Sequence, residues 1–213
     1  MIPDQLISHI QEHSGQAIVS TKRASGGSIN QAALIELEDA GPCFLKWNPT
    51  TDSDLFVKEV KGLDLLASAG TDLLVPEVID QGAYDGHIGY LLLEYIEEGS
   101  AGSSSAEDFG RELAAQHKVT EERFGLNHDN YIGKLPQSNN WQENWVDFFI
   151  QQRMEPQLKM ALDSGELSSS TRSLFENMYQ QLPDIFPKSP PVCYMEISGR
   201  QLLFQHPGKS GDL

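Results

Sequence analysis

The spacing of apolar residues changes several times along the chain, and each change marks a predicted element. Ile2, Leu6 and Ile10 recur at helical spacing and Gly15 follows them, which predicts a short opening helix. The next pattern alternates between apolar and polar residues and is interrupted by glycine-containing turns, as in an antiparallel meander. The three predicted strands cover residues 17–23, 31–39 and 42–48.

Helical spacing returns in residues 52–69 and is followed by two more strand patterns. Phe56, Val60, Leu63 and Ala67 share one face of the predicted helix. The strands are predicted at residues 75–84 and 87–96. The first half of the chain is therefore expected to form a small sheet with one helix inserted before its last two strands.

A polar stretch, EEGSAGSSS at residues 97–105, separates this half from a helix-rich half. Ser104 and Glu107 form a capping-box pattern at the start of the next helix. The order of elements favours an α+β, protein-kinase-like two-lobed fold, in which an antiparallel sheet closes over a helical lobe and nucleotide binds between them. We expect a small lobe at 1–96 and a hinge at 97–105. Further helical segments are predicted at 141–163 and 168–181, after a loop at 125–140.

The net charge of the chain limits the classes of molecule that it is expected to bind. The 31 acidic and 15 basic side chains give a formal net charge of -16, which disfavours binding to nucleic acid or to anionic lipid. The two cysteines have no CxxC spacing, no apolar run approaches the roughly 18 residues of a membrane helix, and the first residues lack the pattern of a signal peptide. We therefore expect a cytoplasmic protein without a membrane or nucleic-acid partner.

A glycine pair lies between the first two predicted strands. In the segment SGGSIN, Gly26 and Gly27 would let the backbone approach a phosphate closely, with Ser28 and Asn30 beside them. A plain hairpin turn is the alternative, because a short glycine pair is a weak motif.

Two charged residues follow the glycine pair in an order that favours nucleotide binding. Lys46, in the strand FLKW, could reach phosphates as a point charge, although an exposed strand lysine is the alternative. Glu59, on the next helix, could hold Lys46 extended, as a helix glutamate does in protein kinases. Alternatively, Glu59 is a solvated helix charge paired with Lys58 or Lys61.

The last strand of the first half offers a place for an adenine. An extended segment presents alternating carbonyl and amide groups, so the carbonyl of Glu94 and the amide of Ile96 are the expected partners of the base. Leu93 and Tyr95 flank them. Glycine loop, lysine, glutamate and hinge strand occur in the right order, and this conjunction is more specific than any one of them.

A loop in the second half carries aromatic and amide side chains suited to a polar substrate pocket. The candidates are Asn130, Tyr131, Gln137 and Trp141. The alternative is a structured connector in which Trp141 is a core anchor.

The string FGLNHDNYIG..PQ.N.W...W..FF...R..PQL..A at residues 124–161 resembles the signature region of the fructosamine kinase (ketosamine 3-kinase) family. SGGSINQA, FLKWN, Glu59, VPEVI and LLLEYI fall where that family has its glycine loop, lysine strand, helix glutamate and hinge. The resemblance covers about residues 1–192. It implies a kinase that uses ATP and Mg²⁺ to phosphorylate the 3-hydroxyl of a fructosamine or ribulosamine, on a small amine or a protein lysine, and so acts in deglycation. An aminoglycoside or choline kinase-like enzyme is an alternative that the loop at 125–145 argues against.

The chain departs from the family where the chemistry is expected. The family strings HGDLWxGN and DPA supply the catalytic base and the metal ligands, and neither is present, so no catalytic or metal-ligating residue is assigned. We expect an incomplete helical lobe at 106–192, weak nucleotide binding and little turnover. A noncatalytic pseudokinase or fold remnant is the alternative from a different class.

The last residues, 193–213, are interpreted as a frameshifted tail that begins after Val192. One permitted back-translation of VCYMEISGR, read from its third base, gives LLHGDLWS. The residues from Arg200 onward, read from the second base, give GNFFFNTQGKAV. Together these restore the missing motif, which predicts a second base slip near Gly199 and Arg200.

Overall fold

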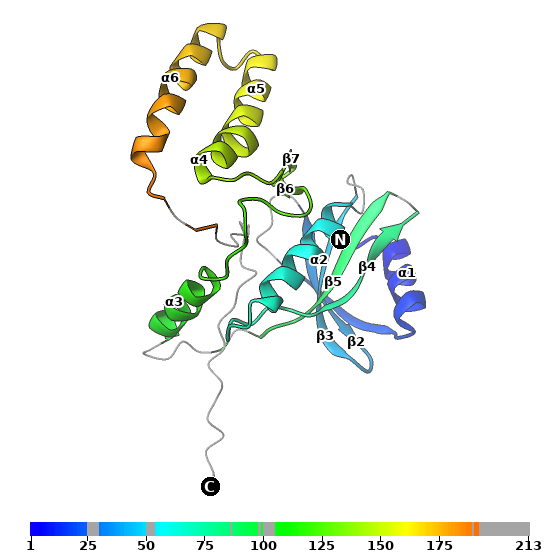
Figure 1. The fold of residues 1–213 in the computed structure, drawn as a ribbon. Helices are drawn as coiled ribbons and strands as arrows, with labels where there is room; N and C mark the ends of the chain where they lie inside the picture. Colours follow the sequence, from blue (N-terminus) through cyan, green and yellow to red (C-terminus); the bar gives the residue numbers. More distant parts are fainter. Residues whose placement is uncertain are drawn as a thin grey trace. The chain divides into compact units, whose positions relative to one another are not determined.

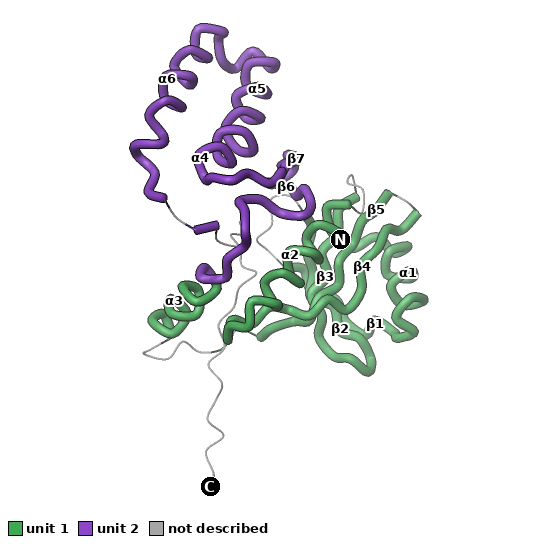
Figure 2. Tube along the Cα trace, viewed as in Figure 1, with its two compact units in different colours: residues 1–116, 195–213 green, residues 117–194 purple. Residues whose placement is uncertain are grey.

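The computed structural model describes residues 1–24, 30–49, 54–85, 87–97, 99, 105–188 and 190–191. These residues divide into two compact units after Gln116 (Figure 2). The predicted tail at 193–213 lies outside the described residues.

The first unit is built on a five-stranded antiparallel sheet with strand order β1-β2-β3-β5-β4 (Figure 1). The predicted meander of the first three strands is confirmed, and the last strand inserts between β3 and β4. The strands are β1 Ile18–Arg23, β2 Gln31–Leu37, β3 Gly41–Asn48, β4 Val78–Tyr84 and β5 Ile88–Glu94.

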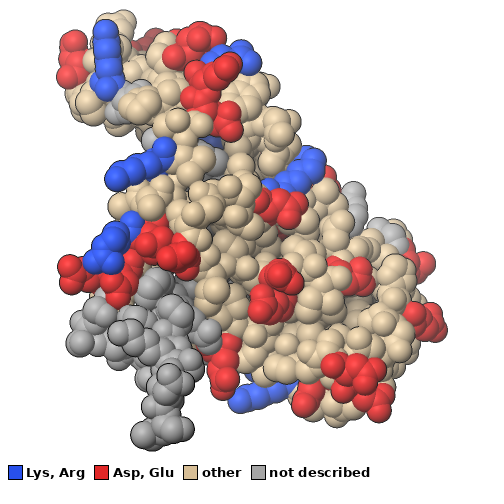
Figure 3. Space-filling view, turned by 60° about the horizontal axis from the view of Figure 1, so that its bottom comes forward, with Lys and Arg blue, Asp and Glu red and all other residues tan. Residues whose placement is uncertain are grey.

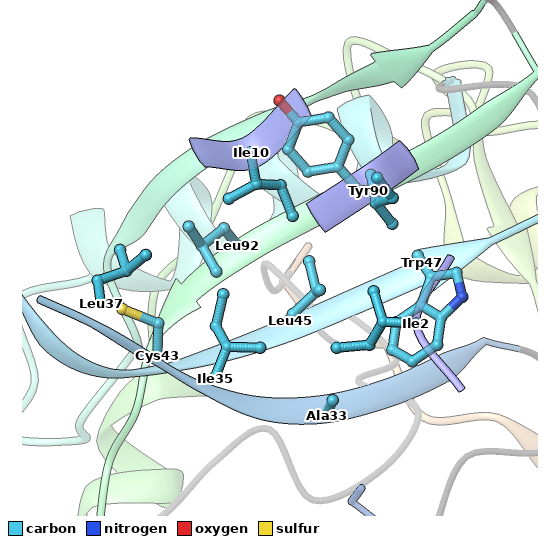
Figure 4. Close-up of a cluster of buried hydrophobic side chains, with 11 residues drawn as sticks. Ile2, Ile10, Ala33, Ile35, Leu37, Cys43, Leu45, Trp47, Tyr90 and Leu92 are labelled. Carbon is cyan, nitrogen blue, oxygen red and sulfur yellow. The ribbon is translucent and has the colours of Figure 1, made fainter. Parts of the chain in front are cut away.

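Helix α1, Asp4–Ser14, covers one face of this sheet. Because successive strand residues point to opposite faces, one alternate set of strand side chains meets the helix. Each such aliphatic side chain contributes about 1.5–3 kcal/mol when it is fully buried. The resulting core contains Ile2, Leu6, Ile10, Ala33, Ile35, Leu37, Cys43, Leu45, Trp47, Tyr90 and Leu92 (Figure 4).

Helix α2, Asp54–Ser68, packs on β5 and β4 with a buried stripe that differs from the predicted one. Phe56 and Leu63 are buried as predicted, but Ala67 is exposed. Leu55 and Leu66 are buried in its place, because a leucine removes more apolar area from water than an alanine does. The helix is therefore rotated about its axis so that Glu59, four residues after Leu55, lies on the buried stripe.

Helix α3, Ser105–Gln116, is bonded to the end of α2 and to the residues that follow α2. Gln116 accepts a hydrogen bond from Thr71 Oγ1 at 2.9 Å and donates from Nε2 to the carbonyl of Leu66 at 3.3 Å. The amide of Asp72 donates to Glu112 Oε2 at 3.0 Å. These bonds place α3 with the first unit, whereas the lobe boundary at 97–105 stays a prediction.

The second unit has a small hairpin followed by helices. The segment 125–140, expected to be a loop, contains this hairpin, and the segment expected to be helical from residue 141 begins its helix at Trp145 and contains a π-helix. The last helix continues through Pro183, which removes one backbone donor, and ends two residues later. The elements are β6 Asn130–Ile132, β7 Leu135–Gln137, α4 Trp145–Phe148, the π-helix Phe149–Met154, α5 Glu155–Asp163 and α6 Ser169–Ile185.

Candidate functional site

Lys46 and Glu59 form an ion pair between the sheet and helix α2 of the first unit. Leu45 and Trp47 point into the α1 core, so the alternation of β3 sends Lys46 to the α2 face. Glu59 lies four residues after Leu55 and four before Leu63, which places it on the buried stripe. The two side chains are only 16% and 17% exposed, so water screens their attraction far less than that of a surface pair. Two partners were considered for Glu59 from the sequence, Lys46 or a lysine of its own helix, and the structure pairs it with Lys46. Lys58 pairs with Asp54 at 3.8 Å.

A buried asparagine two residues after Lys46 bonds to the end of the predicted glycine loop. Asn48 is 2% exposed and donates from Nδ2 to Asn30 Oδ1 at 3.0 Å. Gly26, Gly27 and Ser28 lie outside the described residues. Asn48 was not among the residues predicted from the sequence, and its bond to Asn30 makes it a candidate site residue. Its signal was a polar side chain at an inward-facing strand position.

The segment predicted to meet the adenine, residues 93–96, spans the end of β5 at Glu94. Leu93 is buried, whereas Tyr95 and Ile96 are half-buried and follow the strand outside the sheet. The amide of Glu94 donates to the carbonyl of Glu77 at 2.9 Å, and Glu94 Oε2 accepts from the amide of Glu77 at 3.3 Å. The exposed carboxylate of Glu94 is thus already hydrogen-bonded to the backbone amide of Glu77, just before strand β4.

In the second unit the candidate substrate residues lie on or beside the small hairpin. Asn130 and Tyr131 are half-buried on β6, and Gln137 is buried at the end of β7. Asn139, two residues further on, is 1% exposed. Its Nδ2 donates to Asn130 Oδ1 and to the carbonyl of His128, both at 3.0 Å. A fully buried polar side chain therefore holds the hairpin to the chain before it.

The π-helix presents two consecutive residues, Gln152 and Arg153, to this segment. Gln152 Oε1 accepts from Ser138 Oγ at 2.6 Å and from the amide of Asn140 at 3.3 Å. Arg153 donates to the carbonyl of Ser138 at 2.8 Å and to Asn139 Oδ1 at 2.7 Å. We call Ser138, Asn139, Asn140, Gln152 and Arg153 the amide hub. Its members were not predicted as site residues, although the arginine stands in the signature string.

The guanidinium of Arg153 also lies over the ring of Phe148, 4.6 Å from its centroid. The ring attracts a cation in this position, which partly compensates for the hydration that the guanidinium loses when it is half-buried. π-helical turns are rare and are frequent at functional sites. Through Asn139 the hub is hydrogen-bonded to the candidate substrate residue Asn130.

Trp141 has the contacts of an anchor. The guanidinium of Arg123 lies 5.7 Å from the centre of its ring. Gly125, at φ +147°, is so close that an added Cβ would lie 3.0 Å from the ring atom Cε3. These contacts match the structured-connector alternative, and a binding role for Trp141 stays a prediction.

Magnesium has no recognisable ligand set in the part of the chain that the structure describes. Within these ranges there is no group of three or more His, Cys, Asp or Glu side chains that could hold a metal ion. Proteins usually hold Mg²⁺ with one or two carboxylates and the phosphates of the substrate, so this finding concerns larger clusters alone.

Acidic side chains are widespread on the face that Figure 3 shows, in line with the net charge of -16. None of the helices within the described ranges is both long and apolar enough to cross a membrane.

Comparison with known proteins gives consistent matches. The family model for fructosamine kinase matches residues 3–192. The chain is 34% identical over 171 residues to a chloroplastic protein-ribulosamine 3-kinase of Arabidopsis thaliana, covering 77% of this chain and 52% of that protein. It is 38% identical over 165 residues to a protein of Lactiplantibacillus plantarum assigned as a ketoamine kinase, covering 78% of this chain and 56% of that one.

A crystal structure agrees with these sequence matches. A protein of Thermobifida fusca assigned as a fructosamine-3-kinase superposes with a TM-score of 0.71 at 30% identity, over 89% of this chain and 65% of that chain. The kinase-like α+β fold predicted from the order of elements is confirmed by this match. The chain spans about half the length of the curated relatives it matches. With a family model that covers nearly all of its residues, the chain belongs to the fructosamine kinase family.

Proposed function

We propose that this chain carries the nucleotide site and part of the substrate site of a ketosamine kinase. The reaction transfers the γ-phosphoryl group of ATP to the 3-hydroxyl of a fructosamine or ribulosamine, on a small amine or a protein lysine. The observation that carries the proposal is the shielded ion pair between Lys46 on β3 and Glu59 on α2. In kinases such a pair keeps the lysine extended toward the phosphates of ATP.

The other described residues have supporting parts in the nucleotide site. Lys46 attracts phosphate oxygens as a point charge, and Glu59 prevents the ammonium from turning away. Asn48 holds Asn30, and through it the exit of the glycine loop, on the sheet. Backbone groups of Glu94 and Ile96 are proposed to meet the edge of the adenine, because the Glu94 carboxylate is already bonded to Glu77.

The substrate is proposed to bind at the hairpin of the second unit. Asn130, Tyr131 and Gln137 offer amide and phenol groups, which suit the hydroxyls of a sugar. The amide hub below the hairpin supports this role, since it holds Asn130 from the buried side.

The 213 residues contain neither of the family strings HGDLWxGN and DPA, which supply a base for the attacking hydroxyl and ligands for Mg²⁺. We therefore propose that these residues bind nucleotide weakly and transfer phosphate very slowly. When bound, Mg²⁺ would neutralise charge on the phosphates. A noncatalytic nucleotide-binding protein is the second candidate, favoured by the same missing strings.

The test is nucleotide binding by the wild-type chain and by three variants, measured by titration calorimetry. Lys46→Met should weaken ATP binding by about 10- to 100-fold, because a charge-assisted contact is worth roughly 1.5–3 kcal/mol. Glu59→Gln should weaken it in the same direction. Lys61→Met removes the same charge from an exposed position on α2 and should leave the affinity unchanged. Equal ATP affinity in the Lys46→Met and wild-type chains would contradict the proposal.

A further inference from the structure

In the second unit, hydrogen bonds link the side chains of Arg153, Asn139 and Asn130 in series, and Arg153 fixes which atom of each amide donates. Arg153 Nη2 donates to Asn139 Oδ1 at 2.7 Å, and Asn139 Nδ2 donates to Asn130 Oδ1 at 3.0 Å. A guanidinium has donors only, so it must face the oxygen of Asn139 and not its NH₂ group. The NH₂ group of Asn139 is thereby turned toward Asn130.

A second contact fixes the same orientation independently. Asn139 Nδ2 also donates to the backbone carbonyl of His128 at 3.0 Å, and a carbonyl can only accept. The side-chain oxygen of Asn139 therefore faces a donor, and its NH₂ group faces acceptors. Neither Asn139 nor its partner Asn130 can exchange the positions of oxygen and nitrogen without losing a hydrogen bond.

The consequence falls on Asn130, which is half-buried on β6. Its Oδ1 already accepts one hydrogen bond from the hub, whereas its NH₂ group has two N–H donors, so the side chain offers a ligand chiefly donors. A donor selects for oxygen lone pairs. The hydroxyl and carbonyl oxygens of a sugar provide them, whereas an ammonium group has donors only and cannot accept a hydrogen bond from Nδ2.

We propose that Asn130 donates a hydrogen bond to an oxygen of the sugar portion of the ketosamine, and that Arg153 is the positioning residue that sets this polarity through Asn139. The inference rests on the proposed function and deepens it: the hairpin recognises the sugar rather than the amine that carries it. Of Arg153, Asn139 and Asn130, only Asn130 is proposed to contact the substrate, and Arg153 acts on it through Asn139.

The burial of Asn139 at the centre of the hub supports a positioning role. Asn139 also donates its backbone amide to Asp129 Oδ1 at 2.9 Å and accepts from the amide of Leu126 at 3.0 Å, so both its backbone and its side chain are paired. A buried polar contact of this kind adds little net stability over apolar residues of similar volume, although the loss of only one partner is costly. It does hold each amide in one orientation.

The decisive variant is Asn130→Asp. An aspartate keeps an oxygen for Asn139 Nδ2 but replaces the NH₂ group with a second oxygen, so the bond to the hub is kept and the donor is lost. The matched control is Asn127→Asp, which makes the same charge change at an exposed position three residues earlier in the chain, where Oδ1 is bonded to the ring of His128 and not to the hub. Calorimetric titration with fructosyl-lysine should show about tenfold or greater weakening for Asn130→Asp and none for Asn127→Asp, with both unfolding in urea at the wild-type midpoint.

Arg153 is tested by a conservative pair. Arg153→Met removes the obligate donor and should weaken fructosyl-lysine binding, whereas Arg153→Lys keeps a donor and should restore much of the affinity. ATP affinity, measured in parallel, should not change in any of these variants, which a general loss of structure would not achieve. If Arg153→Met fails to fold, the comparison of Asn130→Asp with Asn127→Asp still decides.

Unchanged fructosyl-lysine affinity in Asn130→Asp would overturn the inference, and so would the lack of any binding by the wild-type chain. Neither result decides the proposed function, which is judged separately by ATP binding in the wild-type and Lys46→Met chains. Retained ATP binding that depends on Lys46, together with normal sugar binding by Asn130→Asp, would leave the kinase proposal standing without this contact.

Discussion

At the scale of single residues, the candidate sites depend on polar side chains held in packed surroundings. Asn48 and Asn139 are almost fully buried, and each bonds to a residue that the function is proposed to use. Gly125 shows how little room surrounds the second of them. At φ +147° its added Cβ would lie 2.7 Å from the carbonyl oxygen of Asn139 and 3.0 Å from Trp141. Such a contact with backbone cannot be relieved by rotating a side chain.

Gly125→Ala should therefore destabilise the chain by about 1–3 kcal/mol, through backbone strain and the displaced carbonyl of Asn139. The measurement is urea-induced unfolding. Gly110→Ala is the control, because this glycine lies within α3 and an added Cβ would meet nothing within 4 Å. Alanine there should raise stability by about 0.5–1 kcal/mol. Equal stability of the Gly125→Ala and wild-type chains would contradict this prediction, because the backbone near Asn139 would then have moved aside at little energetic cost.

At the scale of elements, strands β4 and β5 are joined by a polar side-chain contact as well as by their backbone pairing. Tyr90 is fully buried and donates to Asp80 Oδ2 at 2.8 Å. Opposite it stands Gly82, where an added Cβ would lie 3.1 Å from the Tyr90 ring, so the glycine makes room for this ring. Burial, and then the hydrogen bond and charge of Asp80, raise the pKa of Tyr90.

This raised pKa predicts a pH dependence of stability. Above pH of about 10 a tyrosine in the unfolded chain ionises, while Tyr90 in the folded chain stays neutral, so its contribution to stability is present below that pH and is lost as pH rises. Tyr90→Phe should be about 1 kcal/mol less stable than the wild-type chain at pH 7. The gap should narrow in urea unfolding above pH of about 10. A gap that widens with pH would contradict the assignment, and Tyr84→Phe, on the edge strand, serves as the comparison.

The elements also show what a sequence can predict. Alternation and helical spacing are properties of apolar residues, and they located the meander, the helix that carries Glu59 and the strand that ends at Glu94. The order of glycine loop, lysine and glutamate then indicated the ion pair that the structure contains. The hub was missed because Asn139, Gln152 and Arg153 are polar, and a buried polar residue has the same pattern as an exposed one. The π-helix was missed because one widened turn hardly alters helical spacing.

At the scale of the whole molecule, the net charge of -16 is the dominant long-range property. Mutual repulsion of the carboxylates lowers stability and is screened by salt, whereas the shielded pair of Lys46 and Glu59 is screened little. Raising NaCl from about 10 mM to about 150 mM should therefore raise the midpoint of thermal unfolding. Differential scanning calorimetry checks this, and a lower midpoint in salt would mean that favourable surface pairs outweigh the repulsion.

The charge also bears on partners. A polyanion would have to approach a surface with twice as many acidic as basic side chains, 31 against 15. We expect the chain to pass through a heparin column at low salt without retention. Retention that disappears with added salt would reveal a local basic surface and would reopen a role with nucleic acid.

The most direct measurement is a side-by-side assay of ATP consumption with fructosyl-lysine. One sample is the chain of 213 residues, and the other is a version whose reading frame is restored after Val192 so that the string HGDLWS follows. The account predicts phosphorylation of fructosyl-lysine by the restored version, abolished by Lys46→Met, and little or none by the 213-residue chain. Activity in neither sample, with both folded, would contradict the proposed kinase function.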